Sequence, residues 1–580
     1  MREARAGRGV GPRMCDRLPP RSVFQLGPLL LAATVLLACA PTSPALGPNQ
    51  PSPPSQPSTP KRITIGAFVI ATNILDNRAR PVPELVIGGL TTLDDRGVRQ
   101  PQLAEAVPSI DNGLWTVFPD GRMQTTHRLR ERVVWHDGAP MTSDDLLFTA
   151  TVAGDAGLTL VVRDATYDLI DRIEAPDPRT VVVTWREPYF QADALFSFVG
   201  GSFTNPLPKH LLEQAYLDDK TTFDQQPFWT TAYVSAGAFR LRDWEQGSRA
   251  ILEAFPDYVL GRPKLDEIEV RFFGDENVLL ANILAGEIDL TPQASVSMDL
   301  GVSVRDQWAG GHIEPYVIGA FSIYPQFHHP DPVALRDPQF RAALLQSIDR
   351  QQMVDEFTHG TSTIAHSVIP TDDPAYPFVK DSIVSYAYDP ARATQTIASL
   401  GFTRGADGFF RDASGEPLSL KVQSAITSGK LTLTVADYLN RVGIKSEGVI
   451  LQSAVATQPE VRYTYTGLDL VNAPIGSTGI VNYLVSAAAP LPERNYRAPN
   501  SSVNRGAYVD PEYDLLMRRY VTAIPLPDRM QSLAQLVHAQ TSQLLVWGLY
   551  NTVYAIVKSN RLQNVPPGVA WNAQTSDVTS

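Results

Sequence analysis

Two kinds of hydrophobic pattern alternate along the chain, one typical of strands and one typical of helices. Short runs rich in β-branched and aromatic residues occur at residues 62–71 (RITIGAFVIA), 179–185 (RTVVVTW) and 266–273 (DEIEVRFF), and these runs predict β-strands. In residues 337–360 apolar positions instead recur at helical spacing, which predicts one amphipathic helix. The irregular alternation of the two patterns predicts a mixed α/β architecture.

The helix predicted in residues 337–360 has clear signals at both ends. Asp337 is a suitable N-cap, Pro338 fits the first turn and Gly360 fits the end. Its apolar face would hold Phe340, Ala343, Leu344, Ser347 and Ile348.

A strand, a turn and a helix are predicted in residues 133–149, VVWHDGAPMTSDDLLFT. The strand would end at Trp135, and Thr142, three residues before Asp145, gives the helix a start that resembles a capping box. Asp144 and Asp145 then lie in the first helical turn, where the helix dipole stabilises a negative charge by roughly 0.3–1 kcal/mol. These two acids therefore need no catalytic explanation.

His136 stands beside Asp137 in this stretch, and the two together could suggest acid/base chemistry or half of a metal site. Asp137-Gly138 is, however, a turn dipeptide, and neither a nucleophile nor a second metal ligand is apparent near His136. We therefore interpret the histidine as part of the scaffold.

The N-terminal region has the pattern of a signal peptide. Six arginines precede an apolar run at residues 29–40 that is too short to span a bilayer stably. The run ends in Leu36-Leu37-Ala38-Cys39, which resembles the lipobox of bacterial lipoproteins. That resemblance implies cleavage after residue 38 and acylation of Cys39. Met14 is a plausible alternative to Met1 as the start, because a complete basic region follows it.

The segment after Cys39 is predicted to be a tether. Residues 41–60 hold eight prolines and no charge, a composition that stays extended and does not pack. We expect residues 39–60 to connect a membrane anchor to a folded part that begins near Lys61. Several acyl chains would be needed for stable anchoring, because one chain binds a membrane only marginally.

Length, charge and cysteine content restrict the classes of function. A chain of 580 residues is too long for one ordinary core, and 43% hydrophobic with 19% charged residues is typical of a globular protein. Residues 1–38 carry six arginines and two acids, so their loss changes the net charge from −12 to −12 − 4 = −16. Nucleic acid is not an expected partner, because phosphate binding needs a basic surface. Cys15 would be removed with the signal peptide and the sulfur of Cys39 would be acylated. No free thiol would then remain, so no disulfide is expected.

The residues around His136 also carry a family resemblance. The stretch LRERVVWHDGAPMTSDDLLFT, residues 129–149, resembles the hallmark of bacterial extracellular solute-binding proteins of the oligopeptide/dipeptide type, family 5. Six further matches follow in the family's order: NPLPKHLLE (205–213), AGAFRL (236–241), AGEIDL (285–290), LRDPQFRAALLQSIDRQQMV (335–354), YDPARA (388–393) and ADYLNRVGIK (436–445).

The resemblance implies an α/β fold similar to the type II periplasmic binding proteins. Two lobes would close on a ligand about a hinge, and an extra α/β domain would be present. The chain would cross between the lobes at residues 318–324 and 546–551, the expected hinges. The implied division is lobe one at residues 61–82, 191–317 and 550–580, the extra domain at 83–190 and lobe two at 318–549.

The function that the resemblance implies is ligand capture for an ATP-driven (ABC) importer, without a cofactor. The protein would be a lipid-anchored, extracytoplasmic monomer that binds a small solute, by default a peptide, and delivers it to permease and ATPase subunits formed by other chains. Nickel, sugars or other solutes remain open as cargo, and so does a sensor or binding module that does not transport.

Three common enzyme motifs do not occur in the chain. The sequence IGSTG at residues 475–479 does not fit G-x-S-x-G, no H-E-x-x-H occurs, and Gly429-Lys430 lacks the first glycine of a P-loop because Ser424 stands there. A secreted hydrolase is therefore the less favoured reading, and no catalytic residue is expected.

His328-His329 could suggest metal capture, since some members of the family carry nickel. Adjacent histidines on a regular strand face opposite sides of the sheet, so both could not bind one ion from a strand. We expect no metal site here.

One segment of the chain departs from the pattern that is usual in the family, and this departure bears on how the ligand is held. Many of its peptide binders have a segment resembling W-x-x-D-Y-x-D-P, in which some carry an aspartate that pairs with the peptide's α-ammonium. Here residues 468–484, LDLVNAPIGSTGIVNYL, contain Asp469 in the strand and no further acid. Burying an ammonium without a partner costs several kcal/mol, so we expect an uncharged or blocked ligand end, or a carboxylate from elsewhere. Groups such as Asn472, Ser477 and Thr478 would hold such an end, and the alternative is that this loop only lines the wall of the site. The other residues expected to contact ligand are Asn73, Tyr324 and Trp547.

Overall fold

The structure is a computed structural model that describes residues 60–69, 81–94, 96–155, 157–158, 165–197, 205–456, 458–473, 475–481, 483–496, 503–566 and 573–579. The expected signal peptide, Cys39, most of the tether and Asn73 lie outside the described residues. Residues 59–580 form one compact unit.

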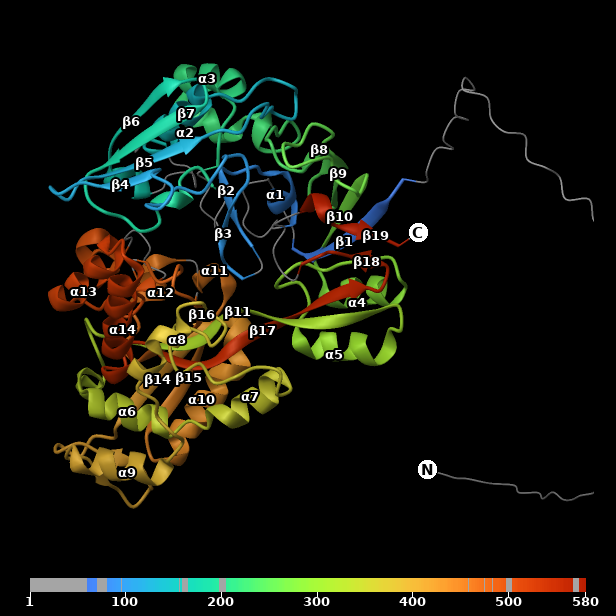
Figure 1. Ribbon diagram of the computed structural model, residues 1–580. Helices are drawn as coiled ribbons and strands as arrows, with labels where there is room; N and C mark the ends of the chain where they lie inside the picture. Colours follow the sequence, from blue (N-terminus) through green and yellow to red (C-terminus); the bar gives the residue numbers. More distant parts are fainter. Residues whose placement is uncertain are drawn as a thin grey trace, which may run out of the picture. The chain divides into compact units, whose positions relative to one another are not determined.

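The first sheet has the order β1-β10-β9-β8 (Figure 1). Its strands are β1 (Arg62–Phe68), β10 (Glu267–Phe273), β9 (Arg249–Ala254) and β8 (Phe239–Glu245). Strands β1 and β10 are parallel and were both predicted from their β-branched runs, and the other two pairs are antiparallel. In β10 buried and half-buried residues alternate, as expected for a sheet with one face against a core.

A second sheet, β4-β5-β7-β6, is antiparallel. It consists of β4 (Trp115–Val117), β5 (Met123–Arg128), β7 (Thr180–Trp185) and β6 (Ile170–Asp177). Helix α2 (Ser143–Ala153) packs against β6 and β7. The strand predicted at residues 179–185 is β7, and the whole sheet comes from the residues assigned above to an extra domain.

The third sheet has the order β15-β14-β16-β11-β17. Its strands are β15 (Lys445–Leu451), β14 (Ser419–Ala425), β16 (Leu468–Ala473), β11 (Gly311–Pro325) and β17 (Trp547–Ser559). Helix α10 (Gly429–Arg441) packs on β14 and β15, and its buried positions carry the helical apolar pattern.

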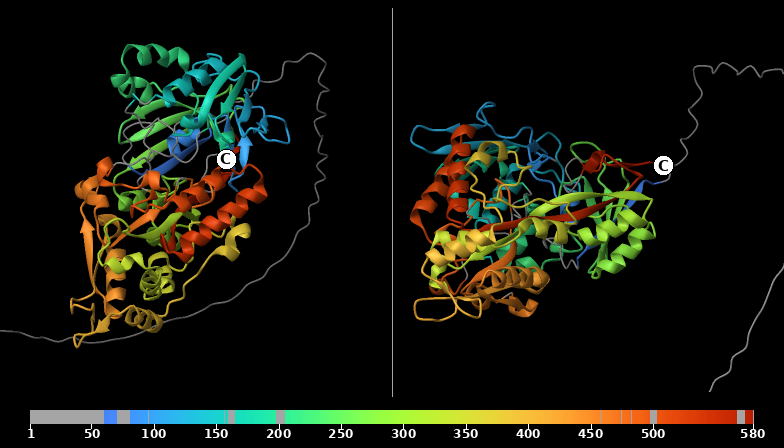
Figure 2. Two further views of the ribbon diagram at one scale, coloured as in Figure 1. Left: turned by 90° about the vertical axis from the view of Figure 1, so that its left-hand side faces the viewer. Right: turned by 90° about the horizontal axis from the view of Figure 1, so that it is seen from below.

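Strands β11 and β17 belong to two hydrophobic cores. Ile313 on β11 and Val553, Ala555 and Val557 on β17 pack with α4 (Glu276–Leu284) and α5 (Met298–Gln307). At its other end β11 pairs with β16 and contributes Ile323 to the core under the third sheet. Figures 1 and 2 show the two strands running together from α4 and α5 into that sheet.

The helix predicted over residues 337–360 is two helices, α6 (Pro338–Gln346) and α7 (Arg350–Thr358). The predicted cap is confirmed, since the Asp337 side chain accepts a hydrogen bond from Gln339 N. The prediction of one continuous helix is wrong, because Ser347 Oγ donates to Leu344 O and the Asp349 side chain caps a new helix at Gln352 N. Both side chains compete with the helical backbone bonds at this point.

The remaining helices and strands are mostly short, except α13 (Pro511–Thr522) and α14 (Leu526–Ser542), whose buried side chains form a further hydrophobic core with Tyr324. They are α1 (Pro81–Val86), β2 (Thr91–Leu93), β3 (Arg99–Pro101), α3 (Lys209–Asp218), α8 (Tyr376–Val379), α9 (Pro390–Ser399), β12 (Thr403–Arg404), β13 (Phe410–Arg411), α11 (Ser453–Ala456), α12 (Pro459–Tyr463), α13 (Pro511–Thr522), α14 (Leu526–Ser542), β18 (Leu562–Gln563) and β19 (Asp577–Val578). Within the described ranges, no helix combines the length and the apolar character needed to cross a bilayer.

Candidate functional site

The loop at residues 475–481 follows β16 at the place where β11 and β17 pass between the two cores. Asn472, near the end of β16, is exposed, and its Oδ1 accepts a hydrogen bond from Thr552 Oγ1 of β17 at 3.0 Å. On the neighbouring strand β11, a Cβ at Gly319 would lie 2.6 Å from the same oxygen and 2.7 Å from the backbone oxygen of Ala473. Only glycine fits there, so Asn472 is held against both crossing strands.

Four hydrogen bonds from distant segments fix the backbone of this loop. They are Gly476 N to Val368 O at 2.8 Å, Ser477 N to Asp373 Oδ2 at 2.7 Å, Tyr520 Oη to Ser477 O at 2.6 Å and Gln191 Nε2 to Thr478 O at 3.2 Å. The φ angle of Gly476 is +98°, a conformation that favours glycine. The loop is therefore well fixed before any ligand arrives.

The side chains of the loop remain available. Ser477 is half-buried and Thr478 is exposed. Neither hydroxyl has a hydrogen-bond partner among the residues that the structure describes. Each hydroxyl can donate one hydrogen bond and accept others, so the loop offers two polar side chains to a ligand, and their contact with ligand stays a prediction.

Tyr324 and Trp547, also expected to contact ligand, are buried side chains. Tyr324 is completely buried, and its hydroxyl shares a short hydrogen bond with that of Tyr483. Burial raises the pKa of Tyr324 to about 12. Trp547 is 1% exposed and donates from Nε1 to Leu544 O at 2.8 Å. Both hold the third sheet in place, and their contact with ligand stays a prediction.

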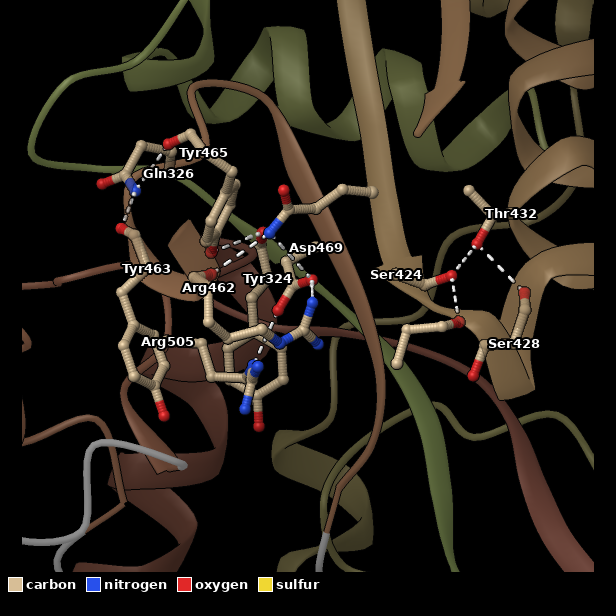
Figure 3. A network of polar contacts seen from close by, with 12 residues as sticks. Tyr324, Gln326, Ser424, Ser428, Thr432, Arg462, Tyr463, Tyr465, Asp469 and Arg505 are labelled. Atoms are coloured by element: carbon tan, nitrogen blue, oxygen red, sulfur yellow. Dashed lines mark hydrogen bonds and ion pairs between the residues drawn. The ribbon is translucent and has the colours of Figure 1, made fainter. Parts of the chain in front are cut away.

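Asp469 has a structural environment that the sequence did not reveal. It is completely buried on β16 between two arginines (Figure 3). Arg505 Nε donates to Oδ2 at 2.6 Å, whereas Arg462 Nη1 lies 2.8 Å from Oδ1 without the alignment of a hydrogen bond. Burial alone would lower the pKa of Arg505, but Asp469 keeps it above its ordinary value.

The Asp469 cluster therefore carries a net charge of +1 inside the protein. Tyr465 packs beside it and donates from its hydroxyl to Tyr324 O at 3.1 Å. Asp469 already has two cationic partners, so it is not free to receive a ligand ammonium. The cluster joins β16, α12 and the segment before α13.

His136 is 6% exposed and has protein partners on both ring nitrogens. Its Nε2 lies 3.1 Å from Gly237 O, and its Nδ1 accepts from Ser235 N at 3.3 Å. The ring also packs edge-on against Phe255. Burial lowers the pKa of His136 to about 4, so the ring is neutral near pH 7 and joins two segments of the fold.

The helix start predicted after this histidine is present. Helix α2 begins at Ser143 with Thr142 as its N-cap. Asp145 accepts from Thr142 N at 2.8 Å and from Lys209 N at 2.9 Å. Its carboxylate therefore fastens α2 to the start of α3 in addition to acting on the helix dipole.

His328 and His329 lie close together, so the assumption that they stand on a regular strand and face opposite sides of it is wrong. Their ring centroids are 4.0 Å apart, because β11 ends at Pro325 and the two histidines follow it in irregular backbone. No group of three or more histidine, cysteine, aspartate or glutamate residues in the described part of the chain could hold a metal ion.

A cavity lies in the core beneath β1 and β10. Its volume is about 80 Å³, and its walls include Ile63, Ile65, Leu265, Ile268 and Ile556. Ligand pockets are usually several times larger and carry convergent polar groups. This cavity does not match a peptide.

Comparison with known proteins gives a family match over more than half of the chain. The family described as "Bacterial extracellular solute-binding proteins, family 5 Middle" matches residues 100–476. The oligopeptide-binding protein AppA of Bacillus subtilis is 24% identical over 66% of this chain and 67% of its own length. A putative ABC transporter peptide-binding protein of Brucella ovis is 27% identical over 47% of this chain. The chain spans 48% of that Brucella protein.

Solved structures show the same fold. The AppA structure from Bacillus subtilis, in complex with a nonapeptide, has a TM-score of 0.68 and 19% identity, with 90% of this chain and all of that chain covered. NikZ from Campylobacter jejuni, in complex with Ni(L-His), has a TM-score of 0.70, 19% identity and the same coverage. These likenesses confirm the predicted fold class, an α/β periplasmic binding protein with several domains.

Proposed function

Because the chain belongs to the bacterial extracellular solute-binding proteins of family 5, we propose that it captures a peptide between two lobes and delivers it to the permease of an ABC importer. The relatives are binding proteins rather than enzymes, so the chemistry to explain is recognition and release. The permease and the ATPase would be separate chains, and the protein would act as a monomer.

One observation carries the proposal: Asn472 is hydrogen-bonded to one of the two strands that connect the cores, and distant segments fix the backbone of the loop that follows it. A ligand favours a closed state only through contacts that differ between the open and closed states. A ligand held at this loop would favour the closed state by contacting both cores at once. We place hinge motion in residues 318–324 and 546–551, where the pairing of β11 with β17 has register shifts at Val317/Gly319 and Phe321/Ser322.

The proposed domains follow the expected division. Lobe one would comprise residues 61–82, 191–317 and 550–580, the extra domain 83–190 and lobe two 318–549. In support, the first and third sheets have separate hydrophobic cores.

Peptides are the proposed cargo because AppA and the Brucella ovis relative are both described as peptide-binding proteins. AppA is called an oligopeptide-binding protein, and its solved structure holds a nonapeptide. The NikZ structure shows that the same fold accommodates Ni(L-His), but His328 and His329 have no third ligand in the described residues. We therefore favour a peptide over nickel.

Anchoring belongs to the proposal as well. Acylation of Cys39 would hold the protein at the outer face of the cell membrane, and the proline-rich residues 41–60 would let it reach the permease. The proposed location is extracytoplasmic.

Native mass spectrometry of the purified full chain tests the cargo. We expect one or more peptides to be released when the complex is dissociated in the gas phase. A peptide at about 100 times its dissociation constant should then stabilise the protein by roughly 2.7 kcal/mol in a thermal-shift assay. A sugar or a metal chelate as the only released ligand would contradict the peptide assignment while leaving solute binding in place.

A further inference from the structure

Two segments that lie far apart in the sequence meet in the fold. Residues 187–193 come shortly after β7 of the second sheet, and residues 518–529 span the corner between α13 and α14. Their backbones are joined by a hydrogen bond that Phe190 N donates to Val521 O at 3.0 Å. We call the contact between these two segments the corner contact.

The ring of Phe190 is at the centre of the corner contact. Its centroid lies 5.1 Å from that of Tyr520 and 4.9 Å from the guanidinium carbon of Arg529. Arg529 also donates to Ala523 O at 3.3 Å and to Ile524 O at 3.0 Å, so the cation that packs on the ring also holds the turn after α13. An aromatic pair or a cation–π contact of this kind changes an equilibrium constant roughly 2- to 10-fold.

The two sides of the corner contact also pack into each other's hydrophobic cores. Phe190 packs against the core that contains the buried side chains of α13 and α14, whereas Val521 and Ile524 pack against the core under the second sheet. Each side therefore covers apolar atoms of the other. Separating the two sides would expose these atoms to water, which is unfavourable.

Opposite charges lie on the two sides as well. Arg518 Nη2 donates to Glu187 Oε2 at 2.6 Å, across a separation of 331 positions. Asp193 is 3.3 Å from Arg99 Nε. Burial raises the pKa of Asp193, and the positive charges of Arg99 and, across the contact, Arg529 oppose that rise. The Asp193 carboxylate therefore attracts the same arginine that packs on the ring.

The proposed hinges separate the two sides of the corner contact along the chain. Residues 187–193 precede the first crossing at residues 318–324, whereas residues 518–529 lie between that crossing and the second one at 546–551. A rotation at these two crossings moves one side relative to the other. Opening and closing of the lobes would therefore break and form the corner contact.

The corner contact is also connected to the loop after β16. Gln191 Nε2 donates to Thr478 O at 3.2 Å, and Tyr520 Oη donates to Ser477 O at 2.6 Å. Gln191 and Tyr520 come from opposite sides of the contact, and both bind the backbone of this loop. The loop is thus fully fixed only when the two sides are together.

We infer that the corner contact is a latch, which holds the two lobes closed and slows the release of any solute bound between them. A contact made only in the closed state stabilises that state by the same factor for every ligand. The inference rests on the proposed function, because a latch governs release only if a solute is captured between the lobes. None of the latch residues needs to touch the solute.

A simpler role for the corner contact is that of a permanent interface. It would then break only when the whole protein unfolds, and weakening it would lower stability without changing release. A latch instead opens in the folded protein. Hydrogen exchange at the amide of Phe190 separates the two roles, because this amide donates across the contact to Val521 O and a local opening exposes far less surface than unfolding.

The experiment uses the purified full chain in four forms: wild type, Phe190→Leu, Arg518→Ala and Arg519→Ala. Arg519 is the matched control, since it is the exposed neighbour of Arg518 on the same helix. Hydrogen exchange at position 190 is followed by mass spectrometry without added peptide, at increasing urea concentrations below the unfolding transition. Dissociation rates are then measured for two unrelated peptides, chosen as tight binders from a synthetic pool of peptides two to nine residues long.

In the wild type, exchange at position 190 should depend much less on urea than exchange in β14, inside the third sheet. Phe190→Leu should raise this exchange rate and both dissociation rates roughly 3- to 10-fold, since leucine keeps the apolar character but loses both ring contacts. Arg518→Ala should raise the same rates roughly 2- to 5-fold, because its ion pair is exposed, and it decides the matter if Phe190→Leu does not fold. Arg519→Ala should change none of these rates.

Three results would overturn the inference. Exchange at position 190 with the full urea dependence of unfolding would show a permanent interface. Dissociation rates that stay unchanged in Phe190→Leu, or that rise for one peptide only, would show that this ring does not hold the lobes closed. An equal effect of Arg519→Ala would show that the charge of α13, and not its pair with Glu187, is responsible. Failure of every peptide in the pool to bind would instead contradict the proposed function, and the exchange measurement would still decide whether the contact opens.

Discussion

Replacing Asp469 with asparagine should destabilise the protein by roughly 3–5 kcal/mol, the cost of removing one partner from a buried ion pair. The side chain is completely buried, and those of Arg462 and Arg505 are each 8% exposed. Asparagine is nearly isosteric, so the change creates almost no cavity. The loss comes from two guanidinium charges that remain in the core with no counter-charge.

Replacing Arg462 with methionine should have a much smaller effect, about 1 kcal/mol or less. Arg505 keeps its hydrogen bond to Asp469 at 2.6 Å, and the net charge of the cluster falls from +1 to zero. Arg462 Nη1 has no aligned hydrogen bond to lose. In the Asp469→Asn background the same replacement should stabilise the protein, because it removes one of two unpaired charges.

Urea unfolding at pH 7 of the wild type, both single variants and the double variant forms a double-mutant cycle. The expected sign reversal of the Arg462→Met effect is the decisive result. The reasoning is refuted if Arg462→Met costs as much as Asp469→Asn in the wild-type background, or if Asp469→Asn costs less than about 1 kcal/mol. An unchanged urea dependence of the unfolding free energy is the control that the unfolded states are comparable.

Three further predictions concern the anchor and two histidines. Cys39→Ser should leave a folded protein that no longer sediments with membranes in cell fractionation; firm membrane association of the variant would contradict acylation. His136→Ala should lower the unfolding free energy by roughly 2–4 kcal/mol, because it leaves a cavity and two unpaired backbone groups. The Kd for ligand, measured by calorimetry, should not change. Lost affinity at unchanged stability would instead place the binding site in residues 133–149. Burial lowers the pKa of His127 to about 4. The unfolded chain therefore binds this proton below about pH 6.5 and the native chain does not, so up to roughly 3 kcal/mol of stability is lost as the pH falls from 6.5 to 4. His127→Leu should remove that part of the loss in urea unfolding at pH 7 and 4.5, and an unchanged loss would contradict the assignment.

The local sequence pattern was sufficient to predict the strands. It was also sufficient for helix ends at which the capping side chain lies close in sequence to the backbone group that it binds. The runs at residues 179–185 and 266–273 are β7 and β10, and Asp337 caps α6 as its spacing predicted. The same pattern missed the break before α7. An apolar face continues through Ser347, but hydroxyl and carboxylate bonds to the backbone end one helix and begin another. The spacing of apolar residues does not reveal these side-chain bonds to the backbone.

The site was predictable only in part. Sequence reasoning proposed Asn472, Ser477 and Thr478. The structure places Asn472 against the crossing strands and the other two in the loop that follows, and the contact of all three with ligand stays a prediction. Sequence reasoning pointed to these residues from one segment alone. It did not identify Gln191, Asp373 or Tyr520 as the groups that fix the loop, because each comes from a distant segment. The sequence around a single aspartate before a short helix does not indicate which distant segment its carboxylate will contact.

Two carboxylates near the same strand and loop have different surroundings for a reason that no local pattern shows. Asp469 is in the expected segment, but Arg462 and Arg505 neutralise it, the second from 36 positions away. Asp373 is 104 positions from Ser477, yet its charge has no cationic partner in the described residues. The net charge near this strand and loop therefore depends on where the arginines lie as much as on where the acids lie. The lack of an acid after Asp469 does not leave the loop at residues 475–481 without a carboxylate, because Asp373 contributes one from a distant segment.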